Sequence, residues 1–121
     1  MKLENTTTLQ KAKQMLADYT IKQLSDNMIY FKPTATIYEY YITYKLDNNN
    51  TGTIQLECKY KDATEYIVNA EQNNDFIRVV SITNKANRTY KDYKYLRKYD
   101  LIITEAHTIL KYKNKLIKSE V

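Results

Sequence analysis

Tyrosines alternate with lysines and arginines in the last third of the chain, and these residues have the clearest chemical potential in the sequence. Residues 85–121 carry ten Lys and Arg against four Asp and Glu, whereas residues 1–84 carry nine against ten. Cationic side chains neutralise phosphates, and exposed tyrosine rings stack on unpaired bases. The segment therefore indicates an anionic partner, and nucleic acid suits both residue types.

A helical projection divides the tyrosines of this segment into two classes. A helix over Thr89 to Lys118 places Tyr95 and Tyr99 on its apolar stripe and the other tyrosines among the cations on the opposite side. A Lys-rich helix face of this kind is ordinarily just solvated, but exposed tyrosines among the cations also suit ligand binding. We expect a binding site formed by three tyrosines, four lysines and one arginine: Tyr90, Tyr93, Lys94, Arg97, Lys98, Lys111, Tyr112 and Lys115.

Two classes of partner fit this surface. The first is nucleic acid or a nucleoprotein complex, bound with little sequence specificity because the chain has only three arginines for guanine readout. The second is an acidic protein surface, since tyrosine is enriched at protein interfaces. The chain would then be an inhibitor or regulator of a host protein, without direct nucleic-acid binding. The side of a predicted hairpin that carries Glu39, Tyr41, Thr43 and Lys45 is an alternative position for the site.

The residues available for catalysis argue against an enzyme. His107 is the only histidine, so several histidines cannot share a metal ion within one chain, and we expect it partly exposed at a helix edge. Glu105, two residues away, points elsewhere on a helix. Cys58 alternates onto the apolar side of a strand, where a buried, unreactive thiol is expected. Gly52 is the only glycine, which excludes glycine-rich phosphate loops, and we expect no cofactor or metal.

Length and composition indicate the class of protein. We expect the 121 residues to form one domain, 1–121, without a membrane span, because no apolar run is long enough. The polar start and the single cysteine favour a cytoplasmic protein. Lys, Asn, Ile and Tyr, which AT-rich codons encode, are abundant, and this bias indicates a phage or other mobile element of an AT-rich bacterium.

Period-two alternation gives the strongest structural signal. Apolar residues alternate from Tyr38 to Leu46 and again from Ile54 to Tyr60, and polar residues with a tolerance for left-handed backbone lie between them at 47–52. We expect a hairpin in which Tyr44 pairs with Leu56, Ile42 with Cys58, and Glu39 with Lys61.

Shorter elements complete the expected sheet. Thr20 to Leu24 and Met28 to Lys32 flank Ser25-Asp26-Asn27 as a second hairpin that ends at Pro33, and Phe76 to Ile82 is predicted as a buried strand. Residues 62–70 fit either a helix capped by Asp62 or a strand over Glu65 to Asn69, and we favour the strand.

Two helices are predicted at the ends of the chain. Capping-box spacing at Thr7 to Gln10 precedes an amphipathic helix over Thr8 to Tyr19. In the C-terminal helix, Leu96, Ile103, Leu110 and Ile117 recur every seven residues, which favours packing on the sheet, with a homodimer through the same stripe as the alternative. The expected fold is α+β: an N-terminal helix, an antiparallel sheet of about five or six strands built from hairpins, and a long C-terminal helix packed on the sheet.

Overall fold

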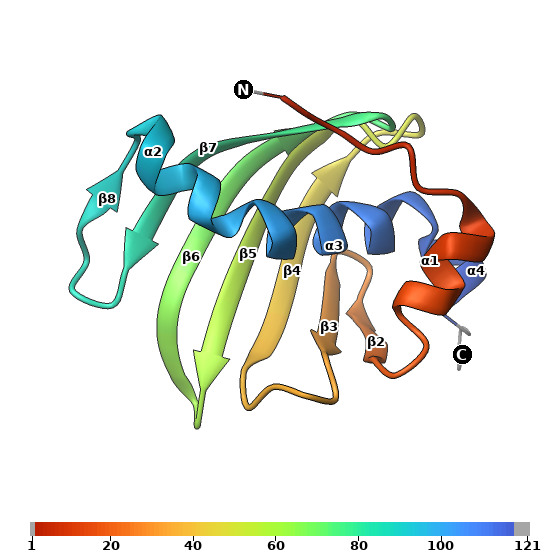
Figure 1. The fold of residues 1–121 in the computed structure, drawn as a ribbon, viewed down its shortest axis with the longest axis horizontal. Coiled ribbons are helices and arrows are strands. Elements are labelled where there is room, and N and C mark those ends of the chain that lie inside the picture. The colour runs from red at the N-terminus through yellow and green to blue at the C-terminus, as the bar shows by residue number, and fades with distance from the viewer. Residues whose placement is uncertain (1, 118–121) are drawn as a thin grey trace.

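The computed structural model describes residues 2–117, which form a curved antiparallel sheet with a helix lying across one face (Figure 1). The predicted α+β class with an antiparallel sheet and a C-terminal helix is confirmed. The strands are β1 (Leu3–Glu4), β2 (Thr20–Ser25), β3 (Met28–Lys32), β4 (Glu39–Leu46), β5 (Gly52–Tyr60), β6 (Ala63–Gln72), β7 (Phe76–Asn84) and β8 (Thr89–Tyr90). The helical segments are α1 (Leu9–Met15), α2 (Tyr93–Leu96), the 3-10 turn η1 (Arg97–Tyr99), α3 (Asp100–Lys111) and α4 (Lys113–Leu116).

The sheet has the order β1-β7-β6-β5-β4-β3-β2, and β8 also pairs with β7. Strands β2 to β7 therefore follow one another as hairpins, as expected from the short connections. The two strands that the sequence analysis missed, β1 and β8, have two residues each and share one edge of β7. Strands this short contain no alternation from which they can be predicted, so the expected number of five or six was too low.

The β4–β5 hairpin is present, but its predicted register is wrong by two residues. Tyr44 lies opposite Ile54 instead of Leu56, and Glu39 lies opposite Lys59 instead of Lys61. Because side chains alternate with a period of two, a shift of two residues leaves every side chain on its expected face. The apolar face of the hairpin was therefore predicted correctly from a wrong pairing.

A tighter loop than expected causes this shift. Gly52 pairs with Leu46, so the loop contains residues 47–51 only. The Asp47 carboxylate closes it by accepting hydrogen bonds from the backbone N–H groups of Asn49 (2.8 Å) and Thr51 (3.1 Å). A Cβ atom at Gly52 would lie 2.0 Å from the Lys45 carbonyl oxygen, so only glycine fits at this position.

The other predicted strands are present, but β7 is buried only at Ile77, Ser81 and Ile82 and not along its length as expected. The β2–β3 hairpin turns at residues 26–27, and β3 ends at Lys32, directly before Pro33. Of the ambiguous residues 62–70, residues 63–70 belong to β6, which is the strand that was favoured. Asp62 does not cap a helix, because Lys61 and Asp62 have φ values of 48° and 67° and form the tight turn between β5 and β6.

Helix α1 begins as predicted and ends early. The Thr8 hydroxyl caps it by accepting a hydrogen bond from the Lys11 N–H at 3.2 Å, and Ala12 and Leu16 are buried. Its last residue is Met15 instead of Tyr19, because β2 begins at Thr20 and the chain must first turn back toward the sheet.

The single helix predicted over Thr89 to Lys118 is wrong for the described part of the chain, and Lys118 lies outside the described residues. Thr89 and Tyr90 are in strand β8, and the Asp92 carboxylate caps α2 by accepting from the Lys94 N–H at 3.0 Å. The 3-10 turn η1 then precedes α3. A second interruption follows at Tyr112, whose φ and ψ of −115° and 20° are not helical.

The seven-residue stripe packs on the sheet, as favoured. Ile103 and Leu110 are fully buried, Leu96 is 9% exposed, and Ile117 is half-buried against the core. Because the sheet of the same chain covers this stripe, the stripe does not offer the seam of a homodimer. No helix among the described residues has the length and apolar character to cross a membrane. The fully buried core side chains come from both layers: Ile29, Phe31, Ile42, Leu56, Val68, Ile82, Ile103, Ile109 and Leu110.

Candidate functional site

The eight predicted binding residues lie in two groups at opposite ends of α3 (Figure 1). Helix α3 has 12 residues and so separates the groups by about 18 Å. The first group lies on β8, α2 and η1: Tyr90, Tyr93, Lys94, Arg97 and Lys98. The second lies at the end of α3, at the residue between α3 and α4, and on α4: Lys111, Tyr112 and Lys115.

Two members of the second group bind the chain's own N-terminal segment. The Lys111 ammonium donates a hydrogen bond to the Asn5 carbonyl oxygen at 3.0 Å, and the Tyr112 hydroxyl donates to the Thr7 carbonyl oxygen. Both side chains are half-buried, whereas Lys115 is exposed. The polar groups of Lys111 and Tyr112 thus hold residues 5–7 against the helix.

The first group belongs to a strongly basic region. Residues 85–98 contain six Lys and Arg and a single Asp, a net charge of +5 that equals the formal charge of the whole chain. The remaining residues are therefore neutral in sum. We call the exposed cations and the exposed tyrosine of this segment the basic end, formed by Lys85, Arg88, Lys91, Tyr93, Lys94, Arg97 and Lys98.

The structure thus adds Lys85, Arg88 and Lys91 to the predicted set. Lys85 and Arg88 lie in the connection between β7 and β8, where a helical projection from Thr89 does not reach. Lys85 forms an exposed ion pair with Glu65 at 3.5 Å. The sum of charges along the sequence could have identified all three residues, because it rises steeply from residue 85 onward.

A row of tyrosine rings in mutual contact lies next to the basic end. Tyr90 stacks on Tyr95 with ring centroids 4.1 Å apart, and Tyr95 contacts Tyr99, which contacts Tyr66 of β6. The Lys98 ammonium lies 4.9 Å from the Tyr95 ring centroid. Tyr90 was expected on the exposed side of a helix, but it is half-buried in β8 and forms part of this row.

His107 is fully buried, which corrects the expectation of partial exposure. Its Nε2 lies 2.9 Å from the Asn73 carbonyl oxygen, so Nε2 carries the proton of this hydrogen bond, and the buried Nδ1 has no partner among the described residues. Burial lowers the pKa of His107 and favours the neutral ring. Glu105 points elsewhere, as expected: it accepts a hydrogen bond from the Tyr19 hydroxyl at 2.9 Å.

Cys58 is 1% exposed, which confirms the prediction of a buried thiol. Burial raises the pKa of this thiol to about 11, although hydrogen bonds with Tyr66 and Tyr40 partly oppose the shift. A thiol that stays protonated and shielded from water is a poor nucleophile. Among the described residues, no three His, Cys, Asp or Glu side chains come close enough to hold a metal ion.

The hairpin side named as an alternative site lies on the polar face of the sheet. The Tyr41 hydroxyl donates to Glu39 at 3.4 Å, and the Lys59 ammonium lies 5.2 Å from the Tyr41 ring centroid. Lys59 also pairs with Glu57 at 3.8 Å. Acidic and basic groups thus neutralise one another here, and this face has weaker electrostatic attraction for an anionic partner than the basic end.

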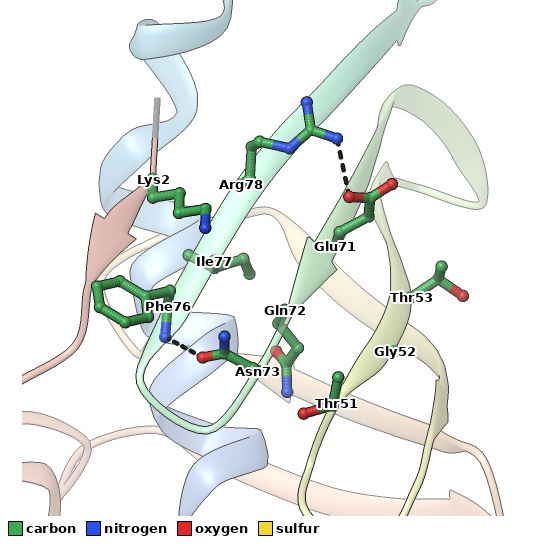
Figure 2. A pocket seen from close by; sticks show the side chains of 10 residues that line it. All are labelled: Lys2, Thr51, Gly52, Thr53, Glu71, Gln72, Asn73, Phe76, Ile77 and Arg78. Carbon is green, nitrogen blue, oxygen red and sulfur yellow. Dashed lines mark hydrogen bonds and ion pairs between the residues drawn. The ribbon is translucent and has the colours of Figure 1, made fainter.

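A hollow of about 350 Å³ lies where β5, β6 and β7 meet near β1 (Figure 2). Figure 2 shows two polar contacts among its lining residues: Arg78 with Glu71 at 2.8 Å, and the Phe76 N–H with the Asn73 side-chain oxygen at 2.8 Å. The Lys2 ammonium lies 5.9 Å from the Phe76 ring centroid. Its lining thus holds two cations and one carboxylate, and the carboxylate is paired with Arg78.

No protein-family model matches the chain, and no curated protein or solved structure matches it either.

Proposed function

We propose that this protein is a non-enzymatic binding protein whose basic end contacts nucleic acid, free or within a nucleoprotein complex. The observation that supports this proposal is the concentration of the chain's entire net charge, +5, in residues 85–98. Six cations at one end of a molecule that is otherwise neutral in sum orient it toward a polyanion and increase the rate of encounter. We also propose a cytoplasmic location, because the only cysteine is a free buried thiol.

The aromatic content of the basic end favours single strands over duplexes. Tyr93 is 48% exposed and lies between Lys91 and Lys94 in sequence. A ring at such a position stacks on unpaired bases, which duplex DNA does not offer. Two arginines, Arg88 and Arg97, are available in the basic end for base-edge recognition. We therefore expect binding with weak sequence preference and a strong dependence on salt.

Fluorescence anisotropy with labelled single-stranded and duplex DNA and RNA tests the proposal. If about six phosphates are contacted, the affinity for a single strand falls by between about two and three decades from 50 to 200 mM salt. Lys94→Gln with Lys98→Gln should weaken binding about tenfold. Lys11→Gln with Lys13→Gln is the matched control, because it removes the same charge from exposed positions of α1 and should change affinity less than about twofold. Equal losses in both variants, or no binding at 50 mM salt, would overturn the proposal.

An acidic protein surface is the second candidate, and Leu101 is the observation that favours it. Leu101 is 75% exposed in the first turn of α3, three residues after Lys98 of η1, so an exposed apolar side chain follows directly on the basic end. Exposed leucine contributes to protein interfaces and has no role in phosphate binding. A pull-down in which Leu101→Ser removes the partner, while the same variant leaves nucleic-acid affinity unchanged, would support this candidate; capture that is insensitive to Leu101→Ser would reject it.

A further inference from the structure

A cleft of about 160 Å³ opens between strand β7 and the segment formed by α2 and η1. This volume greatly exceeds the ~10–15 Å³ that one water molecule requires. Arg78 and Val80 line it from β7, and Tyr93 and Arg97 line it from the opposite side, with Lys91 between β8 and α2. Lys91 and Arg97, two members of the basic end that lie six positions apart in the sequence, thus line the same cleft.

The sheet edge beside this cleft is not fully paired. Strand β1 pairs with β7 as far as Ile77, and β8 pairs with it from Ile82 onward, so residues 78–81 have no strand partner on this side within the described chain. A β-bulge lies within this stretch, because Ala70 pairs with Val79 while the preceding residue of β6 pairs with Ser81. Unpaired strand edges present backbone N–H donors, and bulges reorient them.

The charges around the cleft favour an anion. Three cationic side chains line it against one carboxylate, that of Asp100. The Arg78 guanidinium is only partly available to a ligand in the cleft, because it also forms an ion pair with Glu71 at 2.8 Å. Burial raises the pKa of Asp100, and the positive charge of Arg97 partly opposes this shift. With three cations against one carboxylate, the lining of the cleft holds more positive than negative charge.

We infer that this cleft anchors a phosphate group of the bound strand, with Tyr93 placed at its rim to stack on the adjoining base. This inference rests on the proposed function and specifies which part of the basic end recognises the ligand. Arginine suits the role, because its planar guanidinium donates two parallel hydrogen bonds to phosphate oxygens. The phosphate belongs either to the backbone of the strand or to its 5′ end, and both sources present anionic phosphate oxygens that a guanidinium binds.

Replacement of Arg97 by lysine is the decisive variant, since it keeps the charge and removes the planar fork. Arg97 is exposed, so we expect the variant to fold normally, which circular dichroism checks. We expect Arg97→Lys to weaken binding of a single-stranded oligonucleotide about tenfold without changing the salt dependence. An affinity equal to that of the unaltered protein would overturn the inference. Comparison of oligonucleotides with and without a 5′ phosphate identifies the source. If removal of the 5′ phosphate weakens binding to the unaltered protein about as much as Arg97→Lys does, the cleft binds the terminal phosphate. If its removal leaves the affinity unchanged, the cleft binds a backbone phosphate.

A second measurement separates this inference from the proposed function. Inorganic phosphate is titrated into labelled protein, and amide shifts are followed by NMR at residues 78–81 and at Arg97. Shifts at these positions without oligonucleotide binding would support the cleft and reject the nucleic-acid proposal. Oligonucleotide binding that is steeply salt-dependent, with no phosphate-induced shifts and no effect of Arg97→Lys, would reject the cleft and leave the proposed function in place.

Discussion

The side-chain amide of Asn5 donates a hydrogen bond to the Thr108 hydroxyl at 3.1 Å, joining two residues that lie 103 positions apart. Asn5 is 4% exposed, and its other polar groups are also satisfied: its N–H by the Asp75 carbonyl, its carbonyl by Lys111, and its side-chain oxygen by the Thr7 N–H. One buried asparagine thereby fixes the N-terminal segment to both layers of the fold.

Replacement of Asn5 by alanine should therefore lower the free energy of unfolding by about 1–3 kcal/mol, because it removes the buried hydrogen bond to Thr108 and the partly buried one from the Thr7 N–H. Urea denaturation followed by circular dichroism measures this change. Asn48→Ala is the matched control, since Asn48 is exposed in the β4–β5 loop and the same substitution should cost little there. Equal stabilities of the two variants would contradict the role assigned to Asn5.

Gly52→Ala should also destabilise the protein, by about 1–3 kcal/mol, because the new Cβ atom would lie 2.0 Å from the Lys45 carbonyl oxygen and the strands would have to separate. The shift in urea midpoint measures the effect. Thr53→Ala, which changes the neighbouring exposed position, should stay close to the unaltered protein. A Gly52→Ala variant of unchanged stability would show that the hairpin accommodates the side chain by rearrangement.

Alanine substitutions at Tyr93 and Tyr95 should affect different properties: the first mainly nucleic-acid affinity, the second mainly the stability of the fold. Tyr95→Ala removes the central ring of the tyrosine row and should cost about 2 kcal/mol of stability, less than the ~3–5 kcal/mol of a fully buried aromatic side chain because Tyr95 is half-buried. Tyr93→Ala should cost less than about 1 kcal/mol and reduce single-strand affinity roughly tenfold. Thermal unfolding and anisotropy on both variants test this contrast; a Tyr93→Ala variant with full affinity would exclude base stacking at this ring.

His107 should titrate below its ordinary pKa of 6.5, since burial disfavours the charged ring. The unfolded chain then binds a proton more readily than the folded chain, so this residue makes stability fall as the pH drops below about 6.5. It is the only histidine, so its imidazole NMR signals are unambiguous. His107→Gln, which retains a donor for Asn73, should reduce the slope of stability against pH between about 6.5 and 5. A native pKa at or above 6.5 would contradict this prediction.

Local patterns in the sequence predicted which face of a helix or strand is buried. They were less successful at predicting where an element ends and which residues a strand pairs with. Alternation assigned the buried side of β4 and β5 correctly, because it depends only on the two-residue period of a strand. The register depended on the hydrogen bonds of Asp47 within the loop, which alternation does not describe. Likewise, the seven-residue stripe identified the buried face of α3, but not the interruptions at 97–99 and Tyr112.

The candidate site shows the same division. Charge and residue type are properties of the sequence, so the basic character near residues 90–98 was predicted directly. The engagement of Lys111 and Tyr112 depends on Asn5 and Thr7, more than a hundred positions away, and no helical projection contains those partners. The burial of His107 depends in the same way on the β6–β7 turn, where Asn73 accepts its hydrogen bond.

The contacts that Thr108, Lys111 and Tyr112 make with Asn5 and Thr7 also determine when residues 3–7 can dock during synthesis. Residues 3–7 leave the ribosome well before their partners: β1 pairs with Phe76 and Ile77, and Asn5 and Thr7 are bound by residues 108–112. Contacts of such long sequence separation form late. Residues 3–7 must therefore stay undocked on the nascent chain until residue 112 has emerged, about a hundred residues later.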